Sequence, residues 1–157
     1  MRSQKVVGVI YNSRADAAKA FVKKLVQLFE GSVKLWTGSA DHLNTDNHPI
    51  HETDIVFTVG GDGTILRAAK LTAALAVPIV GVNLGRMGFM TELRSEDALE
   101  KVSSYLGEDL RVEERSMIMV EVNSTSTNGS NQSPIAAFGL NEAALGRGAV
   151  SRLIRVE

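Results

Sequence analysis

A glycine-rich segment with one carboxylate is the part of this sequence best suited to chemistry. It reads Gly60-Gly-Asp-Gly-Thr64 and directly follows the apolar run 55–59. Glycine allows a sharp turn and a close approach of the backbone to a ligand. Where a strand passes into a helix through such a turn, the first backbone N–H groups of the helix bind anions. We therefore predict that Gly60, Gly61 and Gly63 approach phosphate groups.

Two charged side chains near this turn suit phosphoryl transfer. Asp62 could accept the proton of an attacking hydroxyl or hold the magnesium that accompanies a nucleotide; it could equally be an ordinary turn residue. Arg67 lies one helical turn beyond Gly63, and helical side chains lean toward the N-terminus, so its guanidinium could return to the phosphates. The alternative for Arg67 is an exposed helix arginine.

The spacing of the glycines disfavours several other sites. The segment is not a Walker A loop, and no Rossmann Gly-x-Gly-x-x-Gly occurs in the chain. A Gly-x-Ser-x-Gly nucleophile elbow is also missing from the sequence. Hydride transfer with a Rossmann-bound dinucleotide is therefore disfavoured.

A second glycine turn follows another apolar strand. It reads Gly81-Val-Asn-Leu-Gly-Arg-Met-Gly-Phe89. The carboxyl ends of neighbouring parallel strands lie at one edge of a sheet, so we expect both turns to line a single crevice. Thr64 in the first turn, and Asn83 and Gly85 in the second, are further candidates for phosphate contacts.

Alternating strands and helices must position these turns. Apolar β-branched runs predict strands, amphipathic spacing predicts helices, and Gly31 is placed to cap the first helix. The strands are expected at 5–11, 33–36, 55–59 and 79–82, and the helices at 15–30, 65–75 and 95–106, the last capped by Ser95. This order predicts an α/β fold over residues 1–109, an open parallel sheet with flanking helices.

The pattern changes from residue 110 onward. Strand-like runs at 117–122 and 135–140 flank a Ser/Thr/Asn/Gly-rich connection, and no helical pattern separates them. A last strand-like run reaches the final residues of the sequence. We predict that residues 110–157 are the incomplete start of a β-rich second domain, and that the chain is the N-terminal portion of a longer protein.

Composition bounds the remaining classes. The chain has 157 residues, a net charge of −1 and no cysteine, and it contains no long apolar run or signal peptide. We therefore expect a cytoplasmic protein that binds neither nucleic acid nor membrane. All three histidines fall within the polar stretch 37–53, which we predict to be a solvated loop. Their spacing does not match that of zinc enzymes, so no metal ligand is assigned.

Three ordered motifs resemble those of bacterial NAD kinases. They are Gly60-Gly-Asp-Gly-Thr-Ile-Leu-Arg-Ala-Ala69, Pro78-Ile-Val-Gly-Val-Asn-Leu-Gly-Arg-Met-Gly-Phe-Met-Thr-Glu-Leu93 and Asn141-Glu142. Lipid kinases and 6-phosphofructokinases resemble the chain at the start of the first motif only. The resemblance covers essentially the whole chain. It implies transfer of the γ-phosphoryl group of ATP, or of polyphosphate in some members, to the adenosine-ribose 2′-hydroxyl of NAD, with Mg²⁺ as the expected divalent metal.

The resemblance also implies individual roles. Asp62 matches the base that takes the 2′-hydroxyl proton, and Phe89 matches an aromatic residue near the adenine. The implied NAD-binding set is Asp62, Gly63, Arg67, Phe89, Asn141, Glu142 and Arg152, and the set for the phosphates of ATP is Gly60, Gly61, Gly63, Thr64, Asn83 and Gly85.

The resemblance has a limit and leaves alternatives open. Full-length members are expected to be homo-oligomers, dimers or tetramers, and their second half contains a ligand-contacting aspartate and a Gly-Ser-Thr-Ala-Tyr segment that this sequence lacks. The chain alone could therefore be inactive. Two other interpretations stay open, a non-catalytic nucleotide-binding fragment and a related lipid kinase.

Overall fold

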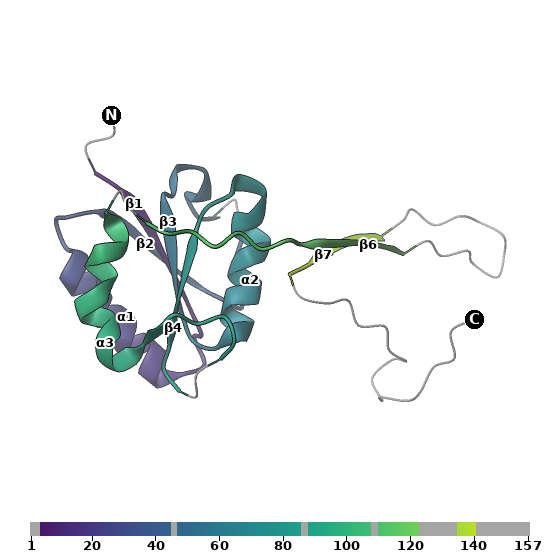
Figure 1. Ribbon diagram of the computed structural model, residues 1–157. Coiled ribbons are helices and arrows are strands. Elements are labelled where there is room, and N and C mark those ends of the chain that lie inside the picture. The colour runs from purple at the N-terminus through teal and green to yellow at the C-terminus, as the bar shows by residue number, and fades with distance from the viewer. Residues whose placement is uncertain (1–3, 45–46, 86–87, 108–109, 123–134, 141–157) are drawn as a thin grey trace, which may run out of the picture. The chain divides into compact units, whose positions relative to one another are not determined.

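The computed structural model describes residues 4–44, 47–85, 88–107, 110–122 and 135–140. The chain divides into two compact units, Met1–Val112 and Glu113–Glu157. In the first unit, a central sheet lies between helices on both faces (Figure 1). None of the helices in the described part of the chain has both the length and the apolar character that a membrane span requires.

The sheet of the first unit is entirely parallel. Its strands lie in the order β2-β1-β3-β4-β5, which is the order of the flavodoxin-like doubly wound sheets. Their bounds are Val6–Tyr11 for β1, Lys34–Ser39 for β2, Ile55–Val59 for β3, Ile79–Asn83 for β4 and Leu93–Arg94 for β5. The predicted α/β fold with an open parallel sheet is confirmed.

Helices cover the sheet from both sides. Helices α1 (Asp16–Phe29) and α3 (Ser95–Lys101) pack on one face, and α2 (Asp62–Thr72) packs on the other (Figure 1). Short 3₁₀ helices follow at Ala73–Leu75 and Val102–Leu106. Gly31 follows α1 with a φ of 75°, the left-handed conformation that commonly ends a helix at glycine.

The alternation of side chains along the strands explains why both faces need cover. Val7, Val9 and Phe57 face the α1 side, while Ile10 and Val56 face the α2 side, and all five are fully buried. A strand that is buried on both faces reads as a continuous apolar run, which is why these strands were predictable.

Part of the stretch 37–53 is not a solvated loop. Residues 37–39 extend β2, and a 3₁₀ helix, Ile50–Glu52, buries Ile50 completely in the α2-side core. Trp36 Nε1 donates to Thr53 Oγ1 at 2.9 Å, and the Trp36 ring stacks on His48 with 4.9 Å between centroids. The prediction was wrong here because tertiary packing of a few apolar residues holds an otherwise polar segment.

Two details near the end of the sheet also differ from the prediction. Arg94, at the end of the two-residue strand β5, is the extended residue before α3, and Ser95 is already helical and makes no capping hydrogen bond. The helix itself begins at the predicted residue. It becomes a 3₁₀ helix after Lys101, so the predicted element 95–106 is two short helices.

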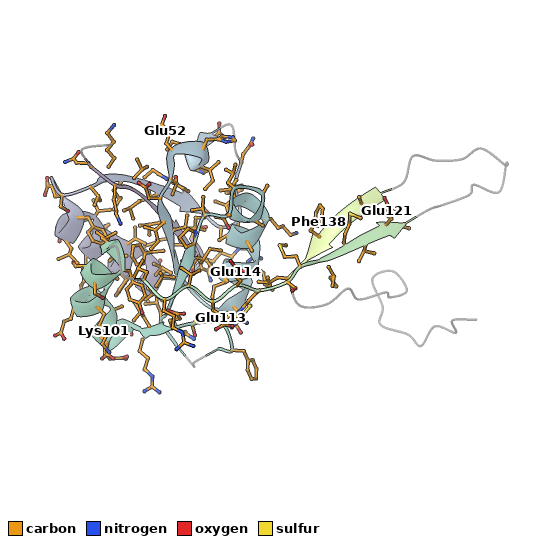
Figure 2. All side chains as sticks on the ribbon, turned by 45° about the horizontal axis from the view of Figure 1, so that its top comes forward. Glu52, Lys101, Glu113, Glu114, Glu121 and Phe138 are labelled. Atoms are coloured by element: carbon orange, nitrogen blue, oxygen red, sulfur yellow. The ribbon has the colours of Figure 1, made fainter. Side chains whose placement is uncertain are left out.

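The second unit contains a two-stranded antiparallel sheet. Strand β6 (Ile118–Val122) pairs with β7 (Ile135–Gly139), with Met119 opposite Phe138. Figure 2 shows Glu121 and Phe138 on these two strands. The side chains of Met119 and Phe138 are each 61% exposed. The predicted start of a β-rich domain after the α/β domain is confirmed as a strand pair.

Candidate active site

The loops that follow four strands of the first unit meet at one edge of the sheet, because the strands are parallel. Strand β2 lies on one side of β1 and β3 lies on the other, so the direction of winding reverses between β1 and β3. Ligands of open α/β sheets bind at this switch point. Each loop is tied to the end of the next strand, since Asn12 N–H donates to Val59 O of β3 at 3.0 Å and Gly60 N–H donates to Val82 O of β4 at 2.9 Å.

The first glycine turn is closed by Thr64. Gly60 has a φ of 158°, and a Cβ atom at this position would collide with Thr64 Oγ1. Thr64 is 3% exposed, and its N–H donates to Gly61 O at 2.8 Å. The buried Thr64 side chain therefore packs against Gly60 and holds the turn in place. Its contact with a phosphate stays a prediction.

Helix α2 begins at Asp62, three residues before the predicted start at residue 65. Gly61 is the extended residue before the helix, and no side chain caps it. Uncapped N–H groups at a helix start carry partial positive charge and attract anions. The Asp62 carboxylate lies within this first turn, at the end of the helix where a negative charge is favoured.

The Asp62 carboxylate joins the two glycine turns. Phe89 N–H donates to its Oδ2 at 3.0 Å, and Met90 N–H donates to its Oδ1 at 3.3 Å. Gly88 lies directly against the carboxylate, since a Cβ atom there would be 2.6 Å from Asp62 Cγ. These contacts were missed from sequence, because Gly88 was seen only as part of the second turn.

Asn83 forms the second glycine turn from within. It is 6% exposed, and its Oδ1 accepts the N–H of Gly85 at 2.8 Å. Its amide nitrogen lies 3.4 Å from Thr91 Oγ1. Gly85 is exposed, and the nearest atom to a Cβ there would be 3.9 Å away. Asn83 thus holds the Gly85 N–H, while a side chain at position 85 would meet only ordinary contacts.

The remaining predicted residues divide into two groups. Arg67 Nη1 donates to Gly63 O at 3.3 Å, so its guanidinium does return to the start of α2. The Phe89 side chain is 99% exposed and is available to stack on a planar group. Three predicted residues, Asn141, Glu142 and Arg152, lie outside the residues that the structure describes.

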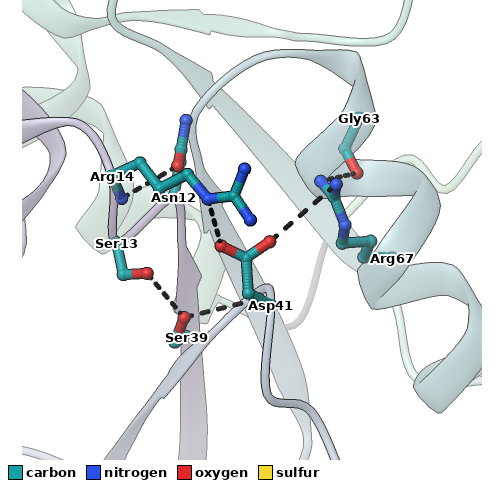
Figure 3. Close-up of polar contacts among 7 residues, drawn as sticks. All are labelled: Asn12, Ser13, Arg14, Ser39, Asp41, Gly63 and Arg67. Atoms are coloured by element: carbon teal, nitrogen blue, oxygen red, sulfur yellow. Dashed lines mark hydrogen bonds and ion pairs between the residues drawn. The ribbon is translucent and has the colours of Figure 1, made fainter.

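A charged cluster beside the first turn was not predicted (Figure 3). Arg14 Nε lies 2.9 Å from Asp41 Oδ2, and Arg67 Nη2 lies 3.9 Å from Asp41 Oδ1. Ser39 Oγ accepts the N–H of Asp41 at 3.3 Å and donates to Ser13 Oγ at 2.8 Å. The cluster could have been predicted from the topology, because Arg14 follows β1 and Asp41 follows β2 at the same edge of the sheet.

The described residues do not form a protein-only metal cage. No group of three or more His, Cys, Asp or Glu side chains converges within the described ranges. Magnesium in nucleotide sites is commonly held by one or two carboxylates together with substrate phosphates. In this mode the substrate phosphates supply many of the ligands, so the described residues need not form a closed cage.

The domain is a doubly wound α/β sheet with a glycine turn, an uncapped helix start and a carboxylate at its switch point. The family model of the ATP-NAD kinase N-terminal domain matches residues 7–109. The chain belongs to the ATP-NAD kinase family.

Relatives in several bacteria support this membership. An NAD kinase from Dehalococcoides mccartyi strain CBDB1 is 37% identical over 153 residues, which cover 97% of this chain and 52% of the relative. An NAD kinase from Heliobacterium modesticaldum is 37% identical over 108 residues, 69% of this chain and 36% of the relative. One from Cutibacterium acnes is 39% identical over 106 residues, 68% of this chain and 32% of the relative. The chain spans about half the length of the first of these relatives.

Proposed function

We propose that the full protein is an NAD kinase, which transfers the γ-phosphoryl group of ATP, or of polyphosphate, to the adenosine-ribose 2′-hydroxyl of NAD. The observation that carries the proposal is the Asp62 carboxylate, fixed between two glycine turns at the switch point of the sheet. Membership in the ATP-NAD kinase family supports the choice of substrates.

In the proposed reaction, Asp62 is the general base. The 2′-hydroxyl gives its proton to the carboxylate, its oxygen forms a bond to the γ-phosphorus, and the bond between that phosphorus and the bridging oxygen breaks, which releases ADP. A carboxylate has lone pairs on both oxygens. Asp62 can therefore accept the substrate hydroxyl while it keeps the two backbone N–H bonds that fix its position.

The backbone of both turns stabilises the transferred group. The proposed phosphate contacts are those of Gly60, Gly61, Gly63, Thr64, Asn83 and Gly85, and the proposed dinucleotide contacts are those of Asp62, Gly63, Arg67, Phe89, Asn141, Glu142 and Arg152. When bound, Mg²⁺ would neutralise phosphate charge and would be held chiefly by the substrate phosphates, which leaves the Asp62 carboxylate to act as the base.

Localisation, partners, oligomeric state and domain organisation belong to the same proposal. The protein works in the cytoplasm, without nucleic acid or membrane partners, and the full protein is a homo-oligomer. Residues 1–109 form the domain that carries the first glycine turn, and 110–157 begin the NAD-binding domain. The end of the family match at residue 109 supports this boundary.

The test is NADP formation by the full protein supplied with NAD, ATP and Mg²⁺. Asp62→Asn keeps the size of the side chain and removes the base, so we expect turnover to fall by about 10²- to 10⁴-fold, the usual contribution of a general base. NAD binding, measured by calorimetry, should stay within a few-fold. An equal loss of binding and turnover would make Asp62 a structural residue, and a wild type that binds nucleotide without forming NADP would refute the kinase assignment.

A further inference from the structure

We propose that Arg14 is a phosphate-binding residue at the switch point, held there by Asp41 opposite Arg67. The ligand class is the phosphate chain of a nucleotide. The inference deepens the proposed function and rests on it for the identity of the nucleotides. Its geometric basis is the meeting of three elements, the loops after β1 and β2 and the first turns of α2 (Figure 3).

The exposure within the cluster shows which partner is the anchor. The Asp41 side chain is 19% exposed, whereas those of Arg14 and Arg67 are 80% and 52% exposed. The carboxylate is thus the inner group and the two guanidinium groups face solvent on either side of it. An exposed ion pair contributes little to the free energy of folding. A gain in stability therefore does not explain why two arginines surround one aspartate.

The guanidinium groups keep donors available for a ligand. Arg14 contacts Asp41 through Nε, and its terminal nitrogens have no hydrogen-bond partner among the residues described. Arg67 Nη1 donates to Gly63 O, whereas Nη2 lies 3.9 Å from Asp41 Oδ1, beyond hydrogen-bond distance. A guanidinium is a planar fork of donors that matches the oxygens of a phosphate.

The backbone that carries Arg14 is hydrogen-bonded next to the first glycine turn, where we propose that the phosphate chain lies. Arg14 N–H donates to Asn12 Oδ1 at 3.1 Å, and Asn12 N–H donates to Val59 O, one residue before Gly60. The loop of Arg14 is therefore tied to the first glycine turn. Because the backbone that carries Arg14 is fixed in advance, less conformational entropy is lost when a ligand binds.

A cavity of about 460 Å³ adjoins the cluster between the loop after β2 and α2, a volume within the range typical of ligand sites. Asp41, Arg67 and Lys70 supply its charged wall, and Ala40, Leu43 and Leu71 supply apolar surface. Cations outnumber the one carboxylate among these residues. Positive charge beside apolar walls favours an anionic ligand, because the field is less screened there.

The first experiment needs no turnover. Binding of inorganic tripolyphosphate to the full protein is measured by calorimetry for wild type, Arg14→Gln, Arg14→Lys and the control Lys101→Gln, which removes another exposed cation, paired with Asp97 on α3. We expect Arg14→Gln to raise Kd by roughly 10- to 100-fold, as for the loss of charged hydrogen bonds. Arg14→Lys should recover part of the loss, and Lys101→Gln should match wild type.

A double-mutant cycle tests the positioning role of Asp41. If Asp41 holds the Arg14 side chain, Arg14→Gln should weaken binding at least threefold less in an Asp41→Asn background than in wild type, because the guanidinium is no longer fixed there. Equal effects in both backgrounds would overturn the role of Asp41. A wild type that does not bind tripolyphosphate, or an Arg14→Gln variant within twofold of wild type, would overturn the subsite.

Steady-state kinetics then identify the source of the phosphates. A rise in KM for ATP alone assigns the subsite to the donor triphosphate, and a rise in KM for NAD alone assigns it to the pyrophosphate of the dinucleotide. A fall in kcat with both KM values unchanged would contradict phosphate binding by Arg14. If wild type binds tripolyphosphate through Arg14 but forms no NADP, the proposed function fails and the subsite stands.

Discussion

Replacing Gly88 by alanine tests whether the contact between the two glycine turns fixes the base. The added methyl group would lie 2.6 Å from Asp62 Cγ and even closer to Oδ1, and ordinary contact begins near 3.4 Å. The carboxylate and residue 88 must therefore separate by more than about 0.8 Å, since Oδ1 is the closer atom. A displacement of about 1 Å in a reacting group can reduce the rate by about 100-fold. We expect kcat/KM for NADP formation to fall by that order in Gly88→Ala.

The effect on stability should be much smaller than the effect on rate. The displacement weakens the hydrogen bonds from Phe89 and Met90 to a carboxylate that is only partly buried, so we expect a loss of about 1–2 kcal/mol in the free energy of unfolding. Gly61→Ala is the matched control for folding, since nothing lies within 4 Å of a Cβ there. It should unfold within about 1 kcal/mol of wild type, because alanine is a poorer N-cap residue than glycine but restricts the unfolded chain. If Gly88→Ala kept kcat/KM within threefold of wild type, the carboxylate would not need this contact and the reasoning would be refuted.

Two further predictions concern the core and the alkaline limit of stability. Phe57→Ala should lose about 3–5 kcal/mol in urea unfolding, because Phe57 is fully buried between Phe29 and Tyr105; a loss below 1 kcal/mol would contradict the packing described. Burial, and then the nearby Glu92 carboxylate, raise the pKa of Tyr105 above its ordinary value of 10.0. A raised folded-state pKa contributes stability that is present below pH 10 and is lost as the pH rises through the folded pKa. The urea midpoint should therefore fall less between pH 9 and pH 11 in Tyr105→Phe than in wild type, and identical slopes would exclude this contribution.

The sheet and its helices were predictable because their signals are local. Strands such as Ile55–Val59 are buried on both faces and read as continuous apolar runs, and α1 shows its buried stripe at helical spacing. The two-residue strand β5 has no periodicity to detect, and it was missed. Ile50 was missed because its burial depends on the opposite sheet face, which the sequence near it does not reveal.

The glycine turns of the candidate site were predictable from the sequence, but the hydrogen bonds and ion pairs between its loops were not. Glycines mark where a turn must come close to a ligand, so the first turn was found directly. The partners of Asp62 are backbone N–H groups, and because nearly every residue supplies one, composition gives no signal for them. The contact of Arg14 with Asp41 joins loops 27 positions apart, and only the strand order brings them together.

The position of β1 between β2 and β3 has a consequence for the chain during synthesis. Strand β1 is made first, and β2 can pair with one of its edges through the β1-α1-β2 crossover once residue 39 has emerged. The other edge must wait for β3, which ends at Val59. At about 5–20 residues per second, synthesis of these about 20 residues takes about 1–4 s. During that interval an apolar strand presents an unpaired edge, which is a known route to aggregation. The speed of translation across residues 40–59 therefore sets how long the nascent chain is exposed to this hazard.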